Sequence, residues 1–156
     1  MKVQEVMRSA VRSITPVTDL ATAGRIMAEI EGGILPVVGA HDCVVGVVTD
    51  RDICLALAAR DRKPSEVQAV QIMSSELFSC SPDHDVRSAL RWMAACKVRR
   101  LVVVDAERKL LGLLALDDVV LHSRALATAG FDGPFHVDIA ETLHQICDHP
   151  TLAVRA

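Results

Sequence analysis

Aromatic residues are scarce in this chain. They make up 3% of 156 residues, with no tyrosine, one tryptophan and three phenylalanines. Proteins that bind single-stranded nucleic acid stack its bases on aromatic side chains, so this class of partner is disfavoured. The net charge of −3 also gives no basic field that would attract a nucleic-acid backbone. Because 51% of the residues are hydrophobic, we expect a globular fold with an aliphatic core.

Long apolar segments are also missing. No run approaches the roughly 18 apolar residues of a transmembrane helix, so we expect no membrane partner. The first five residues are polar and acidic and do not resemble a signal peptide. The cysteines are odd in number and lack the CxxC spacing, which favours reduced thiols in a cytoplasmic protein. We expect most of them to be small core residues. They are Cys43, Cys54, Cys80, Cys96 and Cys147.

Signatures of catalysis are absent as well. The chain has no GxxxxGK[ST] loop, no HExxH motif and no evident pairing of a cysteine nucleophile with a histidine base, so we predict that it is not an enzyme. Near the C-terminus, His144 and Cys147 are three positions apart, and His136 and His149 lie nearby. Histidine and cysteine are good zinc ligands, but this spacing is not a zinc signature. We therefore predict a surface helix and no metal site.

An internal repeat organises the sequence. Residues 7–53 align with residues 73–119 without a gap, with 15 identities in 47 positions. Ordinary residue usage would give roughly a fifth of that number by chance. The aligned positions are 66 residues apart throughout. Two copies of one supersecondary unit therefore follow each other in the chain.

Each copy predicts the element order β-α-β-β-α. A short apolar segment (11–14 or 77–80) and a proline precede an amphipathic helix. Two apolar runs joined by a polar turn then predict a hairpin, and a second helix closes the copy. The hairpins are expected at 34–38 with 43–49 and at 101–104 with 110–115, and the closing helices at 51–60 and 117–129. The core face of the first helix is expected to carry, in the two copies, Leu20, Ala23, Met27, Ile30, and Val86, Ala89, Met93, Cys96.

The polar segment 61–66 contains a proline and predicts the linker between the copies. We therefore divide the chain into a first unit at 1–62, a second unit at 63–129 and a tail at 130–156. Within the tail, residues 137–148 predict a short helix with Ile139, Leu143 and Ile146 on one face. This face is expected to pack on the core or on a second subunit.

The stretch 46–52 reads Gly-Val-Val-Thr-Asp-Arg-Asp and joins a predicted strand to a predicted helix. The start of a helix offers backbone N–H groups that suit a phosphate. A carboxylate only accepts hydrogen bonds, so Asp52 suits ribose hydroxyls, which donate them. The alternative is structural: Thr49 caps the helix and Asp52 is a favourable charge in its first turn.

This motif and its spacing resemble the CBS domain pair, also called a Bateman module. The resemblance covers about residues 1–125 and rests on 46–52, the preceding 33–38, and the second-copy segments 98–105 and 112–118. It implies an α/β fold of two tandem units that pack pseudo-symmetrically through their sheets, with two clefts between them. Such clefts commonly bind AMP, ADP or ATP, and sometimes S-adenosylmethionine.

The resemblance also implies roles for individual residues. Thr49 would contact phosphate, Asp52 would contact the ribose, and Arg99 and Arg100 would reach phosphate. The backbone around Ile14, Thr15 and Pro16 would border the base. The other positions expected at the ligand are Ile34, Pro36 and Asp118.

The two copies depart from the family pattern in opposite ways. Ala115 replaces the hydroxyl of Thr49, whereas Gly33 and Ile34 stand where the second copy has the two arginines. Asp118, which keeps the position of Asp52, is therefore expected to be more structural than ligand-binding. We expect one composite pocket, built from Thr49 and Asp52 with Arg99 or Arg100, and one degraded site.

The expected function is a regulatory module that senses an adenosyl nucleotide, forms a homodimer and acts on an effector protein in trans, with no obligatory cofactor. A ligand-free scaffold with degraded clefts is the alternative.

Overall fold

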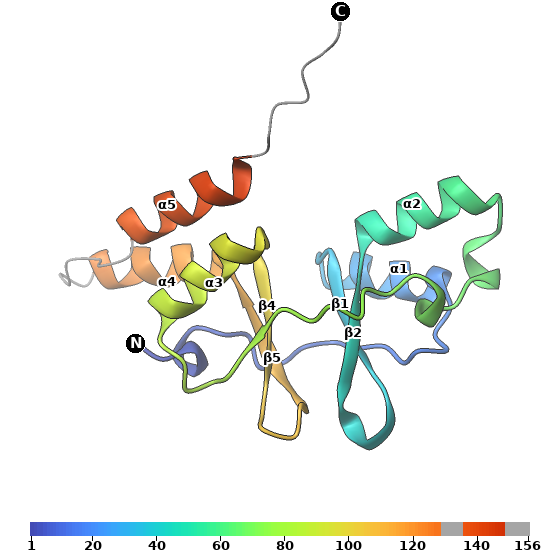
Figure 1. Ribbon diagram of the computed structural model, residues 1–156, viewed down its shortest axis with the longest axis horizontal. Helices are drawn as coiled ribbons and strands as arrows, with labels where there is room; N and C mark the ends of the chain where they lie inside the picture. The colour runs from blue at the N-terminus through green and yellow to red at the C-terminus, as the bar shows by residue number, and fades with distance from the viewer. Residues whose placement is uncertain (129–135, 149–156) are drawn as a thin grey trace, which may run out of the picture.

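The computed structural model describes residues 1–128 and 136–148, and both copies of the repeat form α/β units. The units lie side by side, with their helices on one side of the molecule and their hairpin turns on the other (Figure 1). The first unit contains η1 (Val3–Glu5), α1 (Leu20–Glu29), β1 (Ile34–Val38), η2 (Ala40–Asp42), β2 (Val44–Thr49) and α2 (Asp50–Arg60). The second contains η3 (Pro64–Glu66), η4 (Ala69–Gln71), β3 (Ser79–Cys80), α3 (Val86–Cys96), β4 (Arg100–Val104), β5 (Leu110–Ala115) and α4 (Leu116–Thr128), and α5 (His136–Cys147) follows.

The first long helix of each unit begins at an aspartate cap. The Asp19 carboxylate accepts a hydrogen bond from the Thr22 amide at 2.9 Å, and the Asp85 carboxylate accepts one from the Arg87 amide at 2.9 Å. Hydrogen bonds from the amide and hydroxyl of Thr22 lower the pKa of Asp19. Both aspartates are thus N-caps, each one position before the first residue of its helix.

The predicted core faces are largely confirmed. Three positions of each helix are buried: Leu20, Ala23 and Met27 in α1, and Val86, Ala89 and Met93 in α3. Ile30 was wrongly included, because it follows the last residue of α1 and is 37% exposed. Its counterpart Cys96 is only partly buried.

Both hairpins form as predicted and share one register. In the antiparallel pair β1–β2, Ile34 faces Thr49, and in β4–β5, Arg100 faces Ala115. The first strand of each unit is shorter than expected. In the second unit it is the two-residue β3, parallel to β4, and in the first unit it is a single bridge between Ile14 and Val37. A proline follows within two residues in both copies, and since proline has no N–H, it cannot extend the ladder.

The segment that precedes the first long helix of each unit packs on the other unit, so these two leading segments are exchanged. Val3 of η1 is fully buried in the core of the second unit, and its amide donates to the His84 carbonyl at 2.9 Å. At the equivalent place, Ala69 of η4 is buried in the core of the first unit. Figure 1 shows the N-terminal segment beside α3 and α4, away from α1 and α2. The predicted boundary between residues 62 and 63 therefore divides the chain in sequence, but each leading segment packs on the unit on the other side of that boundary.

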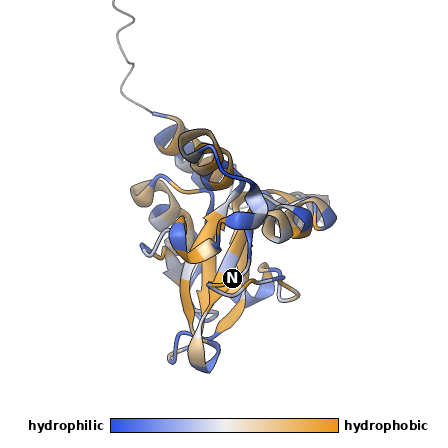
Figure 2. Cartoon of the chain, turned by 90° about the vertical axis from the view of Figure 1, so that its right-hand side faces the viewer, coloured by the Kyte–Doolittle hydropathy of each residue, from blue (hydrophilic) through white to orange (hydrophobic). Residues whose placement is uncertain are grey.

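The two units pack on each other through their sheets, as expected. Val44 of β2 forms one buried cluster with Val102 and Val104 of β4. Single β-bridges also cross the interface, where Val47 pairs with Ser74 and Leu113 pairs with Arg8. In the side view the strands form a hydrophobic interior partly covered by helices of mixed hydropathy (Figure 2).

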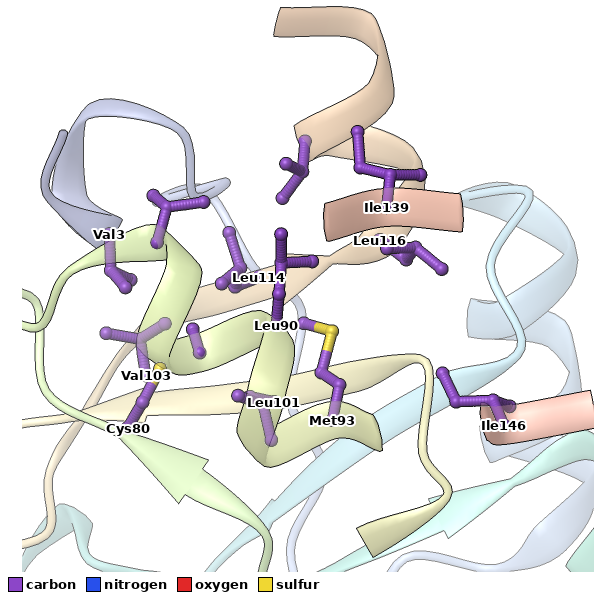
Figure 3. Packing of buried hydrophobic residues seen from close by; sticks show 13 residues of the cluster. Val3, Cys80, Leu90, Met93, Leu101, Val103, Leu114, Leu116, Ile139 and Ile146 are labelled. Carbon is purple, nitrogen blue, oxygen red and sulfur yellow. The ribbon is translucent and has the colours of Figure 1, made fainter. Parts of the chain in front are cut away.

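Helix α5 packs on the core of the second unit. Ile139 and Ile146 are buried against α3, where Leu90 and Met93 lie at the centre of the cluster (Figure 3). Leu143, which was also assigned to the packed face, is 37% exposed, and Thr142 is buried in its place. No helix within residues 1–128 and 136–148 has the length and apolarity needed to span a bilayer.

All five cysteines are free thiols. The expectation that most of them are core residues is wrong, since Cys80 alone is buried while Cys54 and Cys147 are exposed. Burial raises the pKa of the Cys80 thiol to about 11, so this group is protonated at neutral pH.

A close backbone approach requires glycine at two equivalent positions. A Cβ atom at Gly46 would lie 2.5 Å from the Ser74 carbonyl oxygen, and one at Gly112 would lie 2.6 Å from the Arg8 carbonyl oxygen. Ser74 and Arg8 also form β-bridges to the residues that follow these glycines, Ser74 to Val47 and Arg8 to Leu113. A side chain at either position would push the exchanged segment away from its strand.

Replacing Gly46 by alanine is therefore expected to lower the free energy of unfolding by about 1–3 kcal/mol, the usual cost of overpacking. Chemical denaturation followed by circular dichroism measures the change. Gly24→Ala is the matched control, because a Cβ at Gly24 in α1 meets no atom within 4 Å. This control is expected to raise stability by about 0.5–1 kcal/mol. Equal effects of the two substitutions would contradict the proposed close approach.

Candidate functional site

Two clefts lie between the units. The first cleft has a volume of about 700 Å³ and lies between the end of β2, the residues before β4 and the last turn of α5. The second cleft has a volume of about 250 Å³ and lies between the end of β5, the residues before β1 and the N-terminal segment. The first is lined in part by Ile34, Thr49, Asp52, Arg99, Arg100 and Ile146, and the second in part by Arg8, Arg12, Ile34, Arg100, Ala115 and Asp118.

The clefts are related by the internal repeat. Asp52 in the first corresponds to Asp118 in the second, and Ser74 in the first corresponds to Arg8 in the second. Ile34 and Arg100 are counterparts at the starts of β1 and β4, and each of them lines both clefts. The structure thus brings together five of the predicted residues in the first cleft: Ile34, Thr49, Asp52, Arg99 and Arg100.

Thr49 and Asp52 form a reciprocal cap at the start of α2. The Asp52 amide donates to Thr49 Oγ1 at 3.1 Å, and the Thr49 amide donates to Asp52 Oδ2 at 2.9 Å. The Thr49 hydroxyl also donates to Asp52 Oδ2 at 2.7 Å. The structural interpretation of this pair is therefore correct. It leaves Asp52 Oδ1 with no hydrogen-bond partner among the residues that the structure describes.

The expected supply of free amides at the start of α2 is wrong. The Asp50 amide donates to the Gly33 carbonyl at 3.2 Å, and the Arg51 amide donates to Asp50 Oδ1 at 2.8 Å. The third amide, that of Asp52, is used by Thr49. These three amides donate within the protein and are therefore not available to an anion, which leaves charged side chains as the groups that could bind one.

Cationic side chains are plentiful in the first cleft. Its lining contains four, namely Arg51, Lys97, Arg99 and Arg100, against three carboxylates. The Arg100 side chain has no hydrogen bond or ion pair within the described part of the chain, and Arg99 makes only a long contact, 3.9 Å, from Nη2 to Cys147 Sγ. Two arginines in one cleft can hold a phosphate through bidentate hydrogen bonds.

The second cleft differs at its carboxylate. Asp118 is 9% exposed, and its Oδ1 accepts a hydrogen bond from Arg8 Nε at 2.7 Å. Its Oδ2 accepts one from the Ala115 amide at 3.1 Å. Both oxygens therefore have partners from this chain. Sequence reasoning missed Arg8, although its replacement by Ser74 in the other copy was a visible departure from the repeat.

The remaining predicted residues line neither cleft. Ile14 and Pro36 are buried, and the Thr15 hydroxyl lies 3.1 Å from that of Thr18. Pro16 is partly buried. The roles assigned to these four positions stay predictions. Ile146 of α5, in contrast, is a cleft residue that the sequence assigned only to packing.

A metal centre receives no support from the geometry. The described ranges contain no group of three or more histidine, cysteine, aspartate or glutamate side chains able to hold an ion. Cys147 contacts Arg99, and His149 lies outside the described residues.

Comparison with known proteins identifies the family. The model of the CBS domain matches residues 3–59 and 68–124. The chain belongs to the CBS domain family. It is 31% identical over 128 residues to the CBS domain-containing protein YhcV of Bacillus subtilis, covering 82% of this chain and 89% of that protein.

Solved CBS structures share the fold. A conserved CBS domain protein of unknown function from Thermoplasma acidophilum has a TM-score of 0.74 and 25% identity, covering 93% of this chain and 75% of that one. CBSX2 in complex with AMP has a TM-score of 0.70 and 25% identity, covering 81% of this chain and 98% of that one. These comparisons confirm the predicted pair of tandem CBS units.

The cap geometry predicts that Thr49→Ala lowers the stability of the ligand-free protein by about 1 kcal/mol, because the substitution removes the helix cap. Denaturant unfolding of the ligand-free protein measures it. Arg99→Ala serves as the control, since Arg99 lines the same cleft and makes only the long contact to Cys147. Its effect is expected within about 0.5 kcal/mol of zero. A threonine that acted on the ligand alone would leave the unfolding midpoint unchanged.

Proposed function

We propose that this CBS pair is a regulatory module that binds an adenosyl nucleotide in its first cleft and catalyses no reaction on it. The observation that carries the proposal is the pairing of an unpartnered carboxylate oxygen, Asp52 Oδ1, with two arginines in one cleft. Ribose hydroxyls donate hydrogen bonds and phosphate oxygens accept them. A single ligand with a ribose and a phosphate satisfies both ends of this site.

The size of the first cleft supports this choice. Its volume of about 700 Å³ falls within the roughly 300–1,000 Å³ of typical small-molecule sites. The neighbour CBSX2, at 25% identity, was solved in complex with AMP. AMP, ADP and ATP are therefore the first candidates, and S-adenosylmethionine is the candidate without phosphate.

Each polar residue has a distinct proposed role. Asp52 accepts hydrogen bonds from the ribose, and Arg99 with Arg100 binds phosphate. The Thr49 hydroxyl donates its only proton to Asp52 Oδ2. It therefore positions the carboxylate and leaves Oδ1 to the ligand. Thr49 is thus a positioning residue in this proposal, in place of the direct phosphate contact that the family resemblance implied.

The alternative of a ligand-free scaffold finds its support in the second cleft only. There the carboxylate is already paired with Arg8. In the first cleft, the unpartnered oxygen and the unpaired Arg100 favour a ligand.

Binding of AMP and adenosine to single variants tests the site. Arg99→Ala and Arg100→Ala are expected to weaken AMP about 10- to 100-fold, since a hydrogen bond to a charged group contributes about 1.5–3 kcal/mol. The same variants should leave adenosine, which lacks phosphate, nearly unchanged. Asp52→Ala should weaken both ligands. Isothermal titration measures the affinities, and Arg62→Ala, which removes an ion pair with Glu66 outside both clefts, is the control.

Thermal unfolding with AMP, ADP, ATP and S-adenosylmethionine precedes this series, because a saturating ligand raises the melting temperature by mass action. Absence of a shift with all four ligands contradicts the proposed function. An equal loss of AMP and adenosine affinity in the arginine variants contradicts the phosphate assignment.

We also propose that the module forms a homodimer and transmits its ligand state to an effector protein in trans. Leu55 of α2 and Leu121 of α4 occupy equivalent positions of the repeat, and they are 55% and 63% exposed. Val120, next to Leu121 in α4, is 41% exposed. Exposed apolar side chains at equivalent positions of α2 and α4 suit packing against a second copy. A ligand regulates such an assembly only by binding its states unequally.

The charged variants Leu55→Asp and Leu121→Asp are expected to shift a dimer to monomers, because a buried carboxylate without a partner is costly. Light scattering coupled to size-exclusion chromatography measures the mass. Val17→Asp is the control, since Val17 is 67% exposed, more than either leucine, but lies before α1. A dimeric mass that persists in both leucine variants would exclude this surface as the interface.

A further inference from the structure

We infer that Arg8 closes the second cleft to adenosyl ligands, so that each chain binds one ligand, in the first cleft. The inference rests on the proposed function of the first cleft. It assigns to Arg8 the role of a specificity-determining residue, supplied by the N-terminal segment that packs on the second unit.

The hydrogen bonds of the two aspartates carry the inference. Asp118 Oδ1 lies 2.7 Å from Arg8 Nε, and Asp118 Oδ2 lies 3.1 Å from the Ala115 amide. Asp52 uses only Oδ2, in bonds from the amide and hydroxyl of Thr49. A ribose hydroxyl thus finds an accepting oxygen without a competitor at Asp52, whereas at Asp118 it must displace a guanidinium group.

The backbone places residues 8 and 74 equivalently, so the side chain makes the difference. Arg8 bridges to Leu113 with N···O distances of 2.9 and 3.0 Å, and Ser74 bridges to Val47 with distances of 3.0 and 2.9 Å. The short Ser74 hydroxyl bonds locally to the Glu76 carbonyl at 3.4 Å and makes no bond to Asp52. Arginine at the same place spans the cleft to the carboxylate.

The consequences of the arginine agree with this assignment. The second cleft, at about 250 Å³, is much smaller than the first, at about 700 Å³, and Arg8 is part of its lining. Asp118 is nearly buried, so breaking its ion pair would leave a poorly hydrated charge. The helix-capping hydroxyl is absent as well, because Ala115 replaces threonine. A ligand in this cleft would have to displace Arg8 from Asp118, and it would make fewer contacts than a ligand in the first cleft.

Reciprocal exchange of the two residues tests the inference. Isothermal titration with AMP, and separately with S-adenosylmethionine, measures the number of ligands per chain. We expect one for the unmodified protein and two for Arg8→Ser. We expect none for Ser74→Arg, because the new guanidinium would pair with Asp52. Arg12→Ser is the matched control: Arg12 lines the second cleft but pairs with Glu29 at 3.7 Å, and its removal should leave one ligand.

Two further variants locate the ligands and guard against misfolding. Asp52→Ala should abolish the single site of the unmodified protein, and adding Asp118→Ala to Arg8→Ser should abolish the new one. Arg8→Gln keeps the unbranched Cβ–Cγ–Cδ stem and a polar end but removes the guanidinium and its charge. It is expected to bind two ligands, so it replaces Arg8→Ser if that variant does not fold. Circular dichroism establishes folding for each.

The outcomes separate this inference from the proposed function. Two ligands on the unmodified chain, or one ligand on folded Arg8→Ser and Arg8→Gln, overturn the inference and leave the first cleft as the nucleotide site. No ligand on the unmodified chain but one on Arg8→Ser overturns the proposed function of the first cleft, and it supports only the part of the inference by which Arg8 closes the second cleft. Absence of binding to every variant overturns both.

Discussion

The fold depends on two reciprocal backbone contacts between the units. The exchanged segment at Ser74 bridges to Val47, and the one at Arg8 bridges to Leu113. Glycine precedes each bridged strand residue because a side chain there would collide with the carbonyl of the segment. These contacts set the walls of both clefts, since residues 8 and 74 are brought beside the carboxylates that begin α4 and α2. In the proposed function, the identity of these two side chains decides what each cleft accepts.

Duplication followed by divergence explains the unequal clefts in physical terms. In the first unit, the hydroxyl of Thr49 donates to one oxygen of Asp52, and the other oxygen has no partner among the described residues. In the second unit, Arg8 neutralises Asp118 within the chain. Under the proposed function, the charge pair that stabilises Asp118 within the chain is also what prevents this carboxylate from binding a ribose. The equivalent aspartates of the two units thus have alternative proposed uses: Asp118 stabilises the chain through its ion pair, and Asp52 binds a ligand.

Local patterns in the sequence predicted the elements well, because the repeat doubled the signal at every position. The hairpins at β1–β2 and β4–β5 and the buried faces of α1 and α3 followed from periodicity alone. The exchange of leading segments did not, because it depends on contacts such as that of Val3 with α3, far apart in the chain. Arg8 was missed for the same reason, since its partner Asp118 lies 110 positions away. The phosphate role of Thr49 came from the family resemblance, and the sequence alone does not show that Asp52 accepts the proton of this hydroxyl.

Helix α5 lies beyond the two matched CBS domains, yet it completes the first cleft. Ile146 lines that cleft and is buried in the core of the second unit at the same time. Both ends of the helix are held, by an ion pair of 3.1 Å between Arg87 and Asp138 and by a hydrogen bond of 2.7 Å from Lys97 Nζ to the Asp148 carbonyl. The contact of Arg99 with Cys147, at 3.9 Å, is the longest of these, so the proposed binding of phosphate by Arg99 would leave the other two contacts of the helix in place. The helix is therefore a fixed wall, and the cleft exists before a ligand enters it.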